Sequence, residues 1–152
     1  MDNYLYEEIR VKGGAYGYGA SFGLNGSMYF QSYRDPHVSS TFEIFRKTAE
    51  YVSTIDLSQS EIEKYILGTI RGYDRPQSNQ GKGMRAITYH MLGITDEMRQ
   101  KERDEILFAN INDIRKLSQL IASSVAQNNI CAVGSEGALT QNRDLFGNIR
   151  KI

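Results

Sequence analysis

The stretch GGAYGYGASFGLNGSMYFQSY, residues 13–33, decides the fold class that this chain is expected to adopt. From Tyr16 to Leu24, aromatic and aliphatic residues alternate with glycine and serine, and this period of two predicts a strand. Asn25-Gly26 is the strongest short signal for a two-residue hairpin turn. The residues after it, to about Tyr33, are therefore predicted to return as a second, antiparallel strand.

A two-residue turn also predicts which residues face each other across the hairpin. Phe22 would oppose Tyr29 and Tyr18 would oppose Tyr33, which makes one face of the hairpin aromatic. On the other face, glycine and serine of the first strand would oppose Met28 and Phe30. That second face would leave room for the close approach of a helix.

Helical signals lie on both sides of the hairpin. A short helix through Leu5 and Ile9 is predicted to end at Gly13-Gly14, because glycine tolerates the turn that follows a helix. After the hairpin, apolar residues at helical spacing and capping residues predict four or five helices. Their expected starts are Asp35-Pro36, the Ser58–Glu61 capping box, Gly83, Thr95, and Asn110 or Asn112.

The end of the chain is predicted to hold a strand at 129–134, a helix at 139–146 and a short strand at 148–152. Strands come first, then a helical block, then a strand. This order predicts an α+β fold, an antiparallel sheet covered by a block of helices, rather than a regular alternation of strands and helices.

Composition excludes several classes of function. The chain has 152 residues, the size of one domain, and its 18 basic residues balance its 18 acidic residues, so we expect no nucleic-acid partner and no anionic membrane surface. No apolar run reaches the ~20 residues of a membrane span, and the chain does not open with a secretion signal. Its one cysteine, Cys131, excludes an internal disulfide, which fits a reducing compartment such as the cytoplasm or an organelle matrix. Cys131 lies in an apolar run and is expected to be a buried thiol.

No complete catalytic or metal-binding motif is present. His37 and His90 are the only imidazoles and lie far apart, whereas zinc needs three or four protein ligands, so we expect no metal site and no cofactor within this chain. The glycine cluster at 13–19 follows a helix and precedes a strand, the reverse of the order in a phosphate-binding loop. No serine or cysteine stands with a paired base.

The junction LYEEIRVKGGAYG, residues 5–17, resembles the signature in the last domain of presequence proteases, a branch of the pitrilysin/insulinase-type zinc peptidases. Its most specific part is the Arg-Val-x-Gly-Gly-Ala-Tyr-Gly string that begins at Arg10. The resemblance spans nearly the whole chain. It continues through SYRDP at 32–36, GTI at 68–70 ahead of Tyr73-Asp74, GKG at 81–83 and QKER at 100–103.

This resemblance implies that residues 1–152 are one C-terminal domain of a metallopeptidase with four related α+β domains, which close around a peptide chamber. The zinc of such an enzyme is bound by an H-x-x-E-H motif in the first domain, and that motif is absent here. We therefore expect a fragment or separate subunit that is incomplete at its N-terminus and inactive alone. Its expected partners are the remaining domains and short unstructured peptides. An unpaired sheet edge would also favour self-association.

The resemblance also implies a site. Arg10 and Tyr16 match an arginine and a tyrosine that reach the substrate near the scissile bond. Gly14, which lies between them in the chain, is expected to bind the substrate as well. A guanidinium and a phenol both donate hydrogen bonds to carbonyl oxygen, and such donors matter most where charge develops.

Three alternatives stay open at this point. In the first alternative, Arg10 caps the C-terminus of its helix and Tyr16 is an aromatic residue on a packed face. The whole chain would then be a non-catalytic binding or structural module of the same fold. A third reading is an independent ligand-binding domain that uses the glycine-rich strand.

Overall fold

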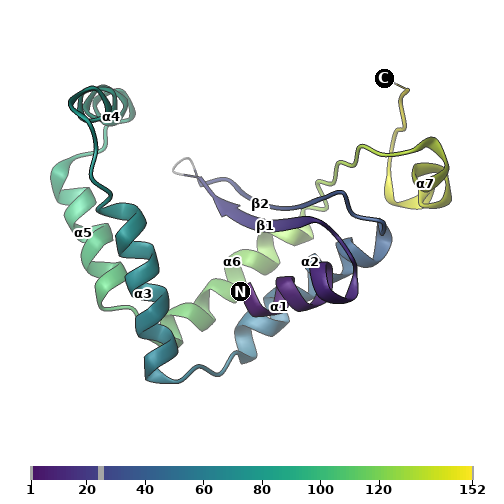
Figure 1. The fold of residues 1–152 in the computed structure, drawn as a ribbon, viewed down its shortest axis with the longest axis horizontal. Helices are drawn as coiled ribbons and strands as arrows, with labels where there is room; N and C mark the ends of the chain where they lie inside the picture. Colours follow the sequence, from purple (N-terminus) through teal and green to yellow (C-terminus); the bar gives the residue numbers. More distant parts are fainter. Residues whose placement is uncertain (1, 24–25, 152) are drawn as a thin grey trace. The chain divides into compact units, whose positions relative to one another are not determined.

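The computed structural model describes residues 2–23 and 26–151, which form two compact units (Figure 1). The first unit combines the chain up to Ile55 with the chain from Arg115, and the second runs from Asp56 to Ile114. The described residues form helices and one antiparallel pair of strands, so the predicted α+β class is confirmed. Within the described ranges, no helix is long and apolar enough to cross a membrane.

The first helix ends where the glycine pair predicts. α1 (Asp2–Leu5) is a short α-helix that continues directly as η1 (Tyr6–Lys12), a wider helix of the π type. Gly13 follows η1, and Gly14 has a left-handed backbone with φ of 73°. A π-type segment is rare and is often found at functional sites, a detail that the sequence pattern did not predict.

The hairpin forms as predicted, but its register differs by one residue. β1 (Gly17–Phe22) pairs with β2 (Met28–Tyr33), and Ala20 lies opposite Phe30. The backbone N–H of Gly23 donates to Ser27 O at 2.8 Å, so the turn spans residues 24–26, one more than a two-residue turn. Gly26 has φ of 78°, as a three-residue turn requires of its last position. Asn25 lies outside the described residues.

A register shift of one residue exchanges the two faces of the second strand, so the predicted face assignment is wrong. Tyr18 and Ala20 now share a face with Phe30, and this face packs on the helices. The glycine-rich face carries Tyr29 and Tyr33, which are 53% and 58% exposed. The helices therefore cover the face with large side chains, and the glycine face is the open one.

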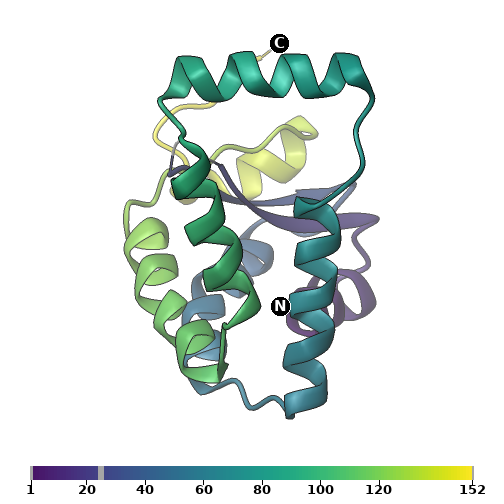
Figure 2. The same ribbon diagram turned by 90° about the vertical axis from the view of Figure 1, so that its left-hand side faces the viewer.

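The core of the first unit lies between this sheet and the helices next to it (Figure 2). α2 (Ser39–Thr54) contributes Phe45, whose ring stacks on Phe30 with centroids 5.0 Å apart. Leu5 and Ile9 of the first helix and Ala15 complete the buried cluster. A small aromatic and aliphatic core thus ties the first helix to β2 and α2.

α2 begins three residues later than Asp35-Pro36 predicts, because Asp35 organises the turn before the helix. Its carboxylate accepts the backbone N–H of His37 at 2.9 Å and the hydroxyl of Thr41 at 2.7 Å. α6 (Ile111–Ala126) begins directly after Asn110, as predicted. Asn110 Oδ1 accepts the backbone N–H of residue 112 at 2.9 Å.

The capping residues correctly predicted the starts of two helices of the second unit. α3 (Gln59–Tyr73) begins at the expected capping box, in which Ser58 and Glu61 each bond the backbone of the other. α5 (Asp96–Leu107) begins after Thr95, as predicted. These side chains satisfy backbone N–H groups that have no partner inside the helix.

α4 (Asn79–Leu92) begins four residues before the predicted Gly83. The reason is Ser78, whose hydroxyl accepts the backbone N–H of Gly81 at 3.2 Å and so caps the helix earlier. Its end is as predicted, at Gly93, which has a left-handed φ of 67°.

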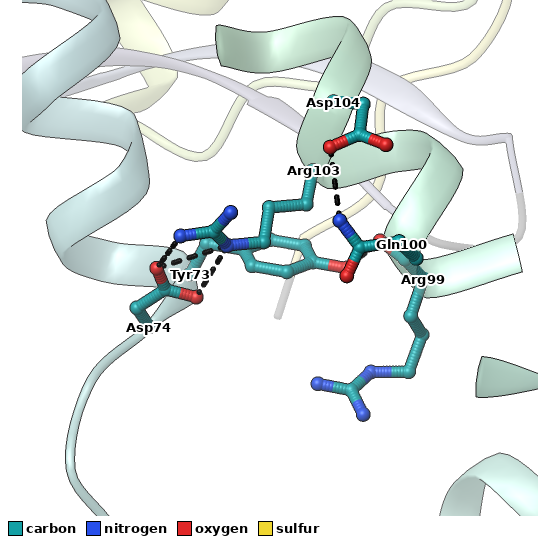
Figure 3. Close-up of polar contacts among 6 residues, drawn as sticks. All are labelled: Tyr73, Asp74, Arg99, Gln100, Arg103 and Asp104. Carbon is teal, nitrogen blue, oxygen red and sulfur yellow. Dashed lines mark hydrogen bonds and ion pairs between the residues drawn. The ribbon is translucent and has the colours of Figure 1, made fainter. Parts of the chain in front are cut away.

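A polar clasp joins the end of α3 to α5 (Figure 3). Arg103 donates from Nε and Nη2 to the carboxylate of Asp74, the latter bond being 2.9 Å long. This hydrogen bonding is the main reason why the pKa of Asp74 lies below its ordinary value. Next to it, the hydroxyl of Tyr73 donates to the backbone carbonyl of Arg99 at 2.8 Å. The clasp replaces apolar packing in a pair of helices that buries few side chains.

The C-terminal predictions are mostly wrong. α7 (Glu136–Gln141) and the 3-10 turn η2 (Arg143–Leu145) lie near the predicted helix. The described residues form no strand at 129–134 or at 148–151, and Ile152 lies outside the described residues. Cys131 is exposed rather than buried, because its segment has no neighbouring strand and is not covered on both faces.

Candidate functional site

The loop between η1 and β1 is held tightly by backbone hydrogen bonds. Gly14 N–H donates to Arg10 O at 3.0 Å, and Ala15 N–H donates to Ile9 O at 3.1 Å. Ile9 and Ala15 are almost fully buried, so the loop is anchored in the core. This fixes the chain on both sides of the glycine pair, where the candidate residues stand.

Arg10 is exposed and lies near β1. It lines a cavity of about 340 Å³ together with Leu5, Phe22 and residues 17–20 of β1. No ion pair of the Arg10 side chain is found among the described residues. Its guanidinium is therefore available to donate hydrogen bonds into this cavity.

Tyr16 is 64% exposed and lies outside that cavity, against the end of β2. Its ring meets the edge of the Tyr33 ring, with centroids 6.2 Å apart and planes at 77°. The guanidinium carbon of Arg34 lies 5.8 Å from the Tyr16 centroid and 5.4 Å from the Tyr33 centroid. We call Tyr16, Tyr33 and Arg34 the aromatic–arginine cluster.

Gly14 stands between the two predicted donors in the chain. Its nearest obstacle to a side chain is Pro36 Cγ, 3.9 Å from where a Cβ would lie, so space does not exclude a larger residue. The left-handed φ of 73° is what requires glycine here. The structure thus places Arg10, Gly14 and Tyr16 on one short exposed segment, with the two side chains against different surfaces.

The chemistry of this segment is hydrogen-bond donation. In the described part of the chain, no three His, Cys, Asp or Glu side chains gather closely enough to hold a metal ion. The side chains at the segment are guanidinium and phenol groups, which are not zinc ligands of the usual kind. The residues of this segment therefore do not fit a zinc ion, which the resemblance places in another domain.

Sequence reasoning did not assign Tyr33 or Arg34 to the site, although both lie in the SYRDP stretch. The predicted register placed Tyr33 opposite Tyr18. In the structure Tyr33 lies opposite Gly17, next to Tyr16 along the strand. A three-residue turn, which a glycine at position 26 permits, would have predicted the observed register and so the contact of Tyr33 with Tyr16.

The family model described as the PreP C-terminal domain matches residues 1–136, which include the whole segment and the cluster. Protein HypA of Clostridium perfringens (strain 13 / Type A) is 40% identical over 150 residues, 99% of this chain and 15% of that protein.

Two further relatives have presequence protease names. Presequence protease 1, chloroplastic/mitochondrial, of Arabidopsis thaliana is 36% identical over 121 residues, 79% of this chain and 11% of that protein. The mitochondrial presequence protease of Emericella nidulans is 36% identical over 135 residues, 88% of this chain and 13% of that protein. The chain therefore spans only 11–15% of the length of these three relatives.

Proposed function

This chain belongs to the PreP C-terminal domain family, and from that premise we propose that it is the substrate-binding C-terminal part of a zinc-dependent peptidase. The proposed substrates are short unstructured peptides. The observation that carries the proposal is the exposed pair of donors, Arg10 and Tyr16, on a loop whose backbone is fixed by the core. Exposed side chains on an anchored loop are suited to bind a ligand without a large ordering cost.

In the proposed mechanism Arg10 donates from its guanidinium to a carbonyl oxygen of the bound peptide and orients it. Tyr16 donates its hydroxyl where negative charge develops on the carbonyl that is attacked. Gly14, which has no side chain, lets the peptide approach the loop. Because the described residues do not fit zinc, the proposal places the metal in another domain and assigns it no step here.

The test is turnover in the complete enzyme. Tyr16→Phe removes only the hydroxyl, and Arg10→Lys keeps the charge but loses the planar fork. Each is expected to lower turnover on the order of 10²–10³-fold, the effect of losing one oxyanion-hole donor. Both residues are exposed, so the thermal stability of the chain should barely change.

A matched control for this test is Tyr29→Phe, which removes the hydroxyl of another exposed tyrosine outside the cluster. It should leave turnover unchanged. Wild-type turnover in the Tyr16→Phe enzyme would mean that Tyr16 has only a packing role. It would favour the alternative of a non-catalytic binding or structural module.

Alone, the chain should bind no stoichiometric zinc and cut no peptide, because the described residues lack a ligand set. Metal analysis after dialysis against zinc, followed by peptide digestion, measures both. Stoichiometric zinc together with cleavage that a chelator abolishes would contradict the proposal that another domain binds the metal.

We also propose that the chain self-associates through its sheet. In the described residues β1 and β2 pair only with each other, which leaves the outer edge of each strand open to another chain. Light scattering over a range of concentrations should show a mass that rises above the monomer. A constant monomer mass would refute it.

The names of the plant and fungal relatives place those proteins in mitochondria or chloroplasts. For this chain we propose the cytoplasm or an organelle matrix. Cell fractionation with an antibody against the chain tests this location.

A further inference from the structure

We propose that Arg34, held against the rings of Tyr16 and Tyr33, is a binding site for a carboxylate of the peptide ligand. The inference rests on the proposed function for the identity of the ligand. It adds a residue and a ligand group that the resemblance does not supply.

The guanidinium of Arg34 lies against two aromatic rings at once. Its carbon is within 6 Å of both centroids, at 5.8 Å from Tyr16 and 5.4 Å from Tyr33, the range in which a cation is attracted to a ring. The rings themselves meet edge to face. Contact with two rings restricts the long side chain before any ligand arrives, so less freedom is lost on binding.

The backbone holds the same three residues together. The N–H of Tyr16 points at two carbonyls, 3.2 Å from Tyr33 O and 3.4 Å from Arg34 O. Arg34 itself has a left-handed φ of 47°, a conformation that disfavours residues with a side chain. Such a conformation is kept only where the surroundings determine it, and observed outliers of this kind are a reason to ask for a function.

Arg34 has no carboxylate partner among the described residues, although one follows it in the chain. No ion pair includes it. The neighbouring carboxylate of Asp35 instead accepts the N–H of His37 on one oxygen and the hydroxyl of Thr41 on the other. A guanidinium presents its donors in a planar fork that matches two carboxylate oxygens, and here that fork is unused.

The space beside the cluster belongs to the open face of the sheet. Gly17 and Gly19 of β1 have no side chains there, and Cβ atoms built on them would stand 3.5 Å from Tyr33 Cβ and 3.4 Å from Gln31 Nε2. A peptide lying over these glycines would have Tyr33 on one side. Its carboxylate would then reach Arg34 at the end of the strand.

The test measures binding to the chain itself, so it does not depend on turnover. Tyrosine and arginine side-chain NMR signals of the chain are followed during titration with three short peptides of one sequence. The first has a free C-terminal carboxylate, the second is amidated, and the third is amidated with one aspartate replacing a neutral residue. We expect the first to shift the Arg34 Nε–H signal and the second not to.

The third peptide distinguishes the source of the carboxylate. Shifts with the first peptide only would assign the site to the peptide C-terminus, and shifts with the third as well would assign it to any carboxylate. Both results support the site. Equal binding of the neutral amidated peptide would overturn it, and so would no shift with any peptide at millimolar concentration.

Variants of the chain complete the test. Arg34→Met should weaken carboxylate binding about tenfold or more, as expected for a hydrogen-bonded charged group. Arg34→Lys should lose most of the affinity, because a lysine lacks the fork. Arg71→Met, which lowers the net charge by the same amount at an exposed position of the second unit, should bind like the unchanged chain. An equal loss in Arg71→Met, or full affinity in Arg34→Lys, would overturn the assignment.

The outcomes separate this inference from the proposed function. Loss of turnover in Tyr16→Phe together with no carboxylate binding would keep the proposed function and reject the role of Arg34. Carboxylate binding at Arg34 together with normal turnover in Tyr16→Phe would keep the role of Arg34 and reject the proposed function.

Discussion

Replacing Gly13 by alanine tests the tight junction between η1 and β1. A Cβ at this position would stand 2.5 Å from Ile9 O and 3.0 Å from Glu8 O, whereas real Cβ atoms essentially never come within 3.0 Å of another atom. One side must therefore move by at least 0.5 Å, the difference between 3.0 and 2.5 Å. Both obstacles are backbone atoms, and Ile9 O also accepts the N–H of the buried Ala15.

Forced movement of this kind in packed structure has a cost of about 1–3 kcal/mol in the free energy of unfolding. In a chain of this length each 1 kcal/mol shifts the unfolding midpoint by about 2–4 °C, so Gly13→Ala should lower the midpoint by roughly 2–12 °C. Circular dichroism during heating measures it. The same movement displaces Arg10, so turnover of the complete enzyme should fall together with stability.

Two other glycines serve as controls for this substitution. Gly83 lies inside α4 with no atom within 4 Å of its Cβ position, so Gly83→Ala should stabilise its unit by about 1 kcal/mol through helix propensity. A Cβ at Gly14 would meet nothing closer than Pro36 Cγ at 3.9 Å, but the φ there is left-handed, so Gly14→Ala should destabilise by about 1–2 kcal/mol. A Gly13→Ala chain as stable as the parent would refute the close approach described above.

Three further predictions concern the cap, the clasp and the core. Ser58→Ala should destabilise by about 1 kcal/mol in urea unfolding because α3 loses its cap, whereas Ser60→Ala should not. The pKa of Asp74 is lowered in the folded chain, chiefly by hydrogen bonding from Arg103, so its contribution is present above the unfolded pKa. That contribution is lost as pH falls through the folded pKa, and Asp74→Asn should flatten this part of a stability–pH series below about pH 4; an unchanged slope would contradict the clasp. Phe45 is 8% exposed and stacks on Phe30, so Phe45→Ala should lower the free energy of unfolding by about 3–5 kcal/mol. A decrease below about 1 kcal/mol would contradict the position of Phe45 in the core.

Local signals in the sequence determined most helix ends correctly. The Ser58–Glu61 box, Thr95 and Gly93 each act on the few backbone groups beside them, so their effect does not depend on the rest of the fold. The same locality explains the error at α4. Ser78 is as good a cap as Thr95, and it stands five residues ahead of the predicted start at Gly83.

The segment at 129–134 shows that local sequence signals are not sufficient to predict a strand. Its apolar residues are typical of a buried strand, but a strand needs a neighbour for its hydrogen bonds and cover for its side chains. Neither is found among the described residues, and Cys131 is exposed as a result. Sequence pattern alone carries no information about whether such a neighbour is in place.

The sequence by itself determined the α+β class, the hairpin, the glycine junction and the candidate residues Arg10, Gly14 and Tyr16. The class, the hairpin and the junction follow from periodicity and turn chemistry, and the candidate residues follow from the family resemblance that a specific string of residues carries. Only the tertiary structure decided which face of the hairpin is buried and which residues stand beside Tyr16. The physical reason is the period of two in a strand. One extra turn residue reverses every facing pair, moving Phe30 into the core and leaving Tyr33 exposed beside Tyr16 and Arg34.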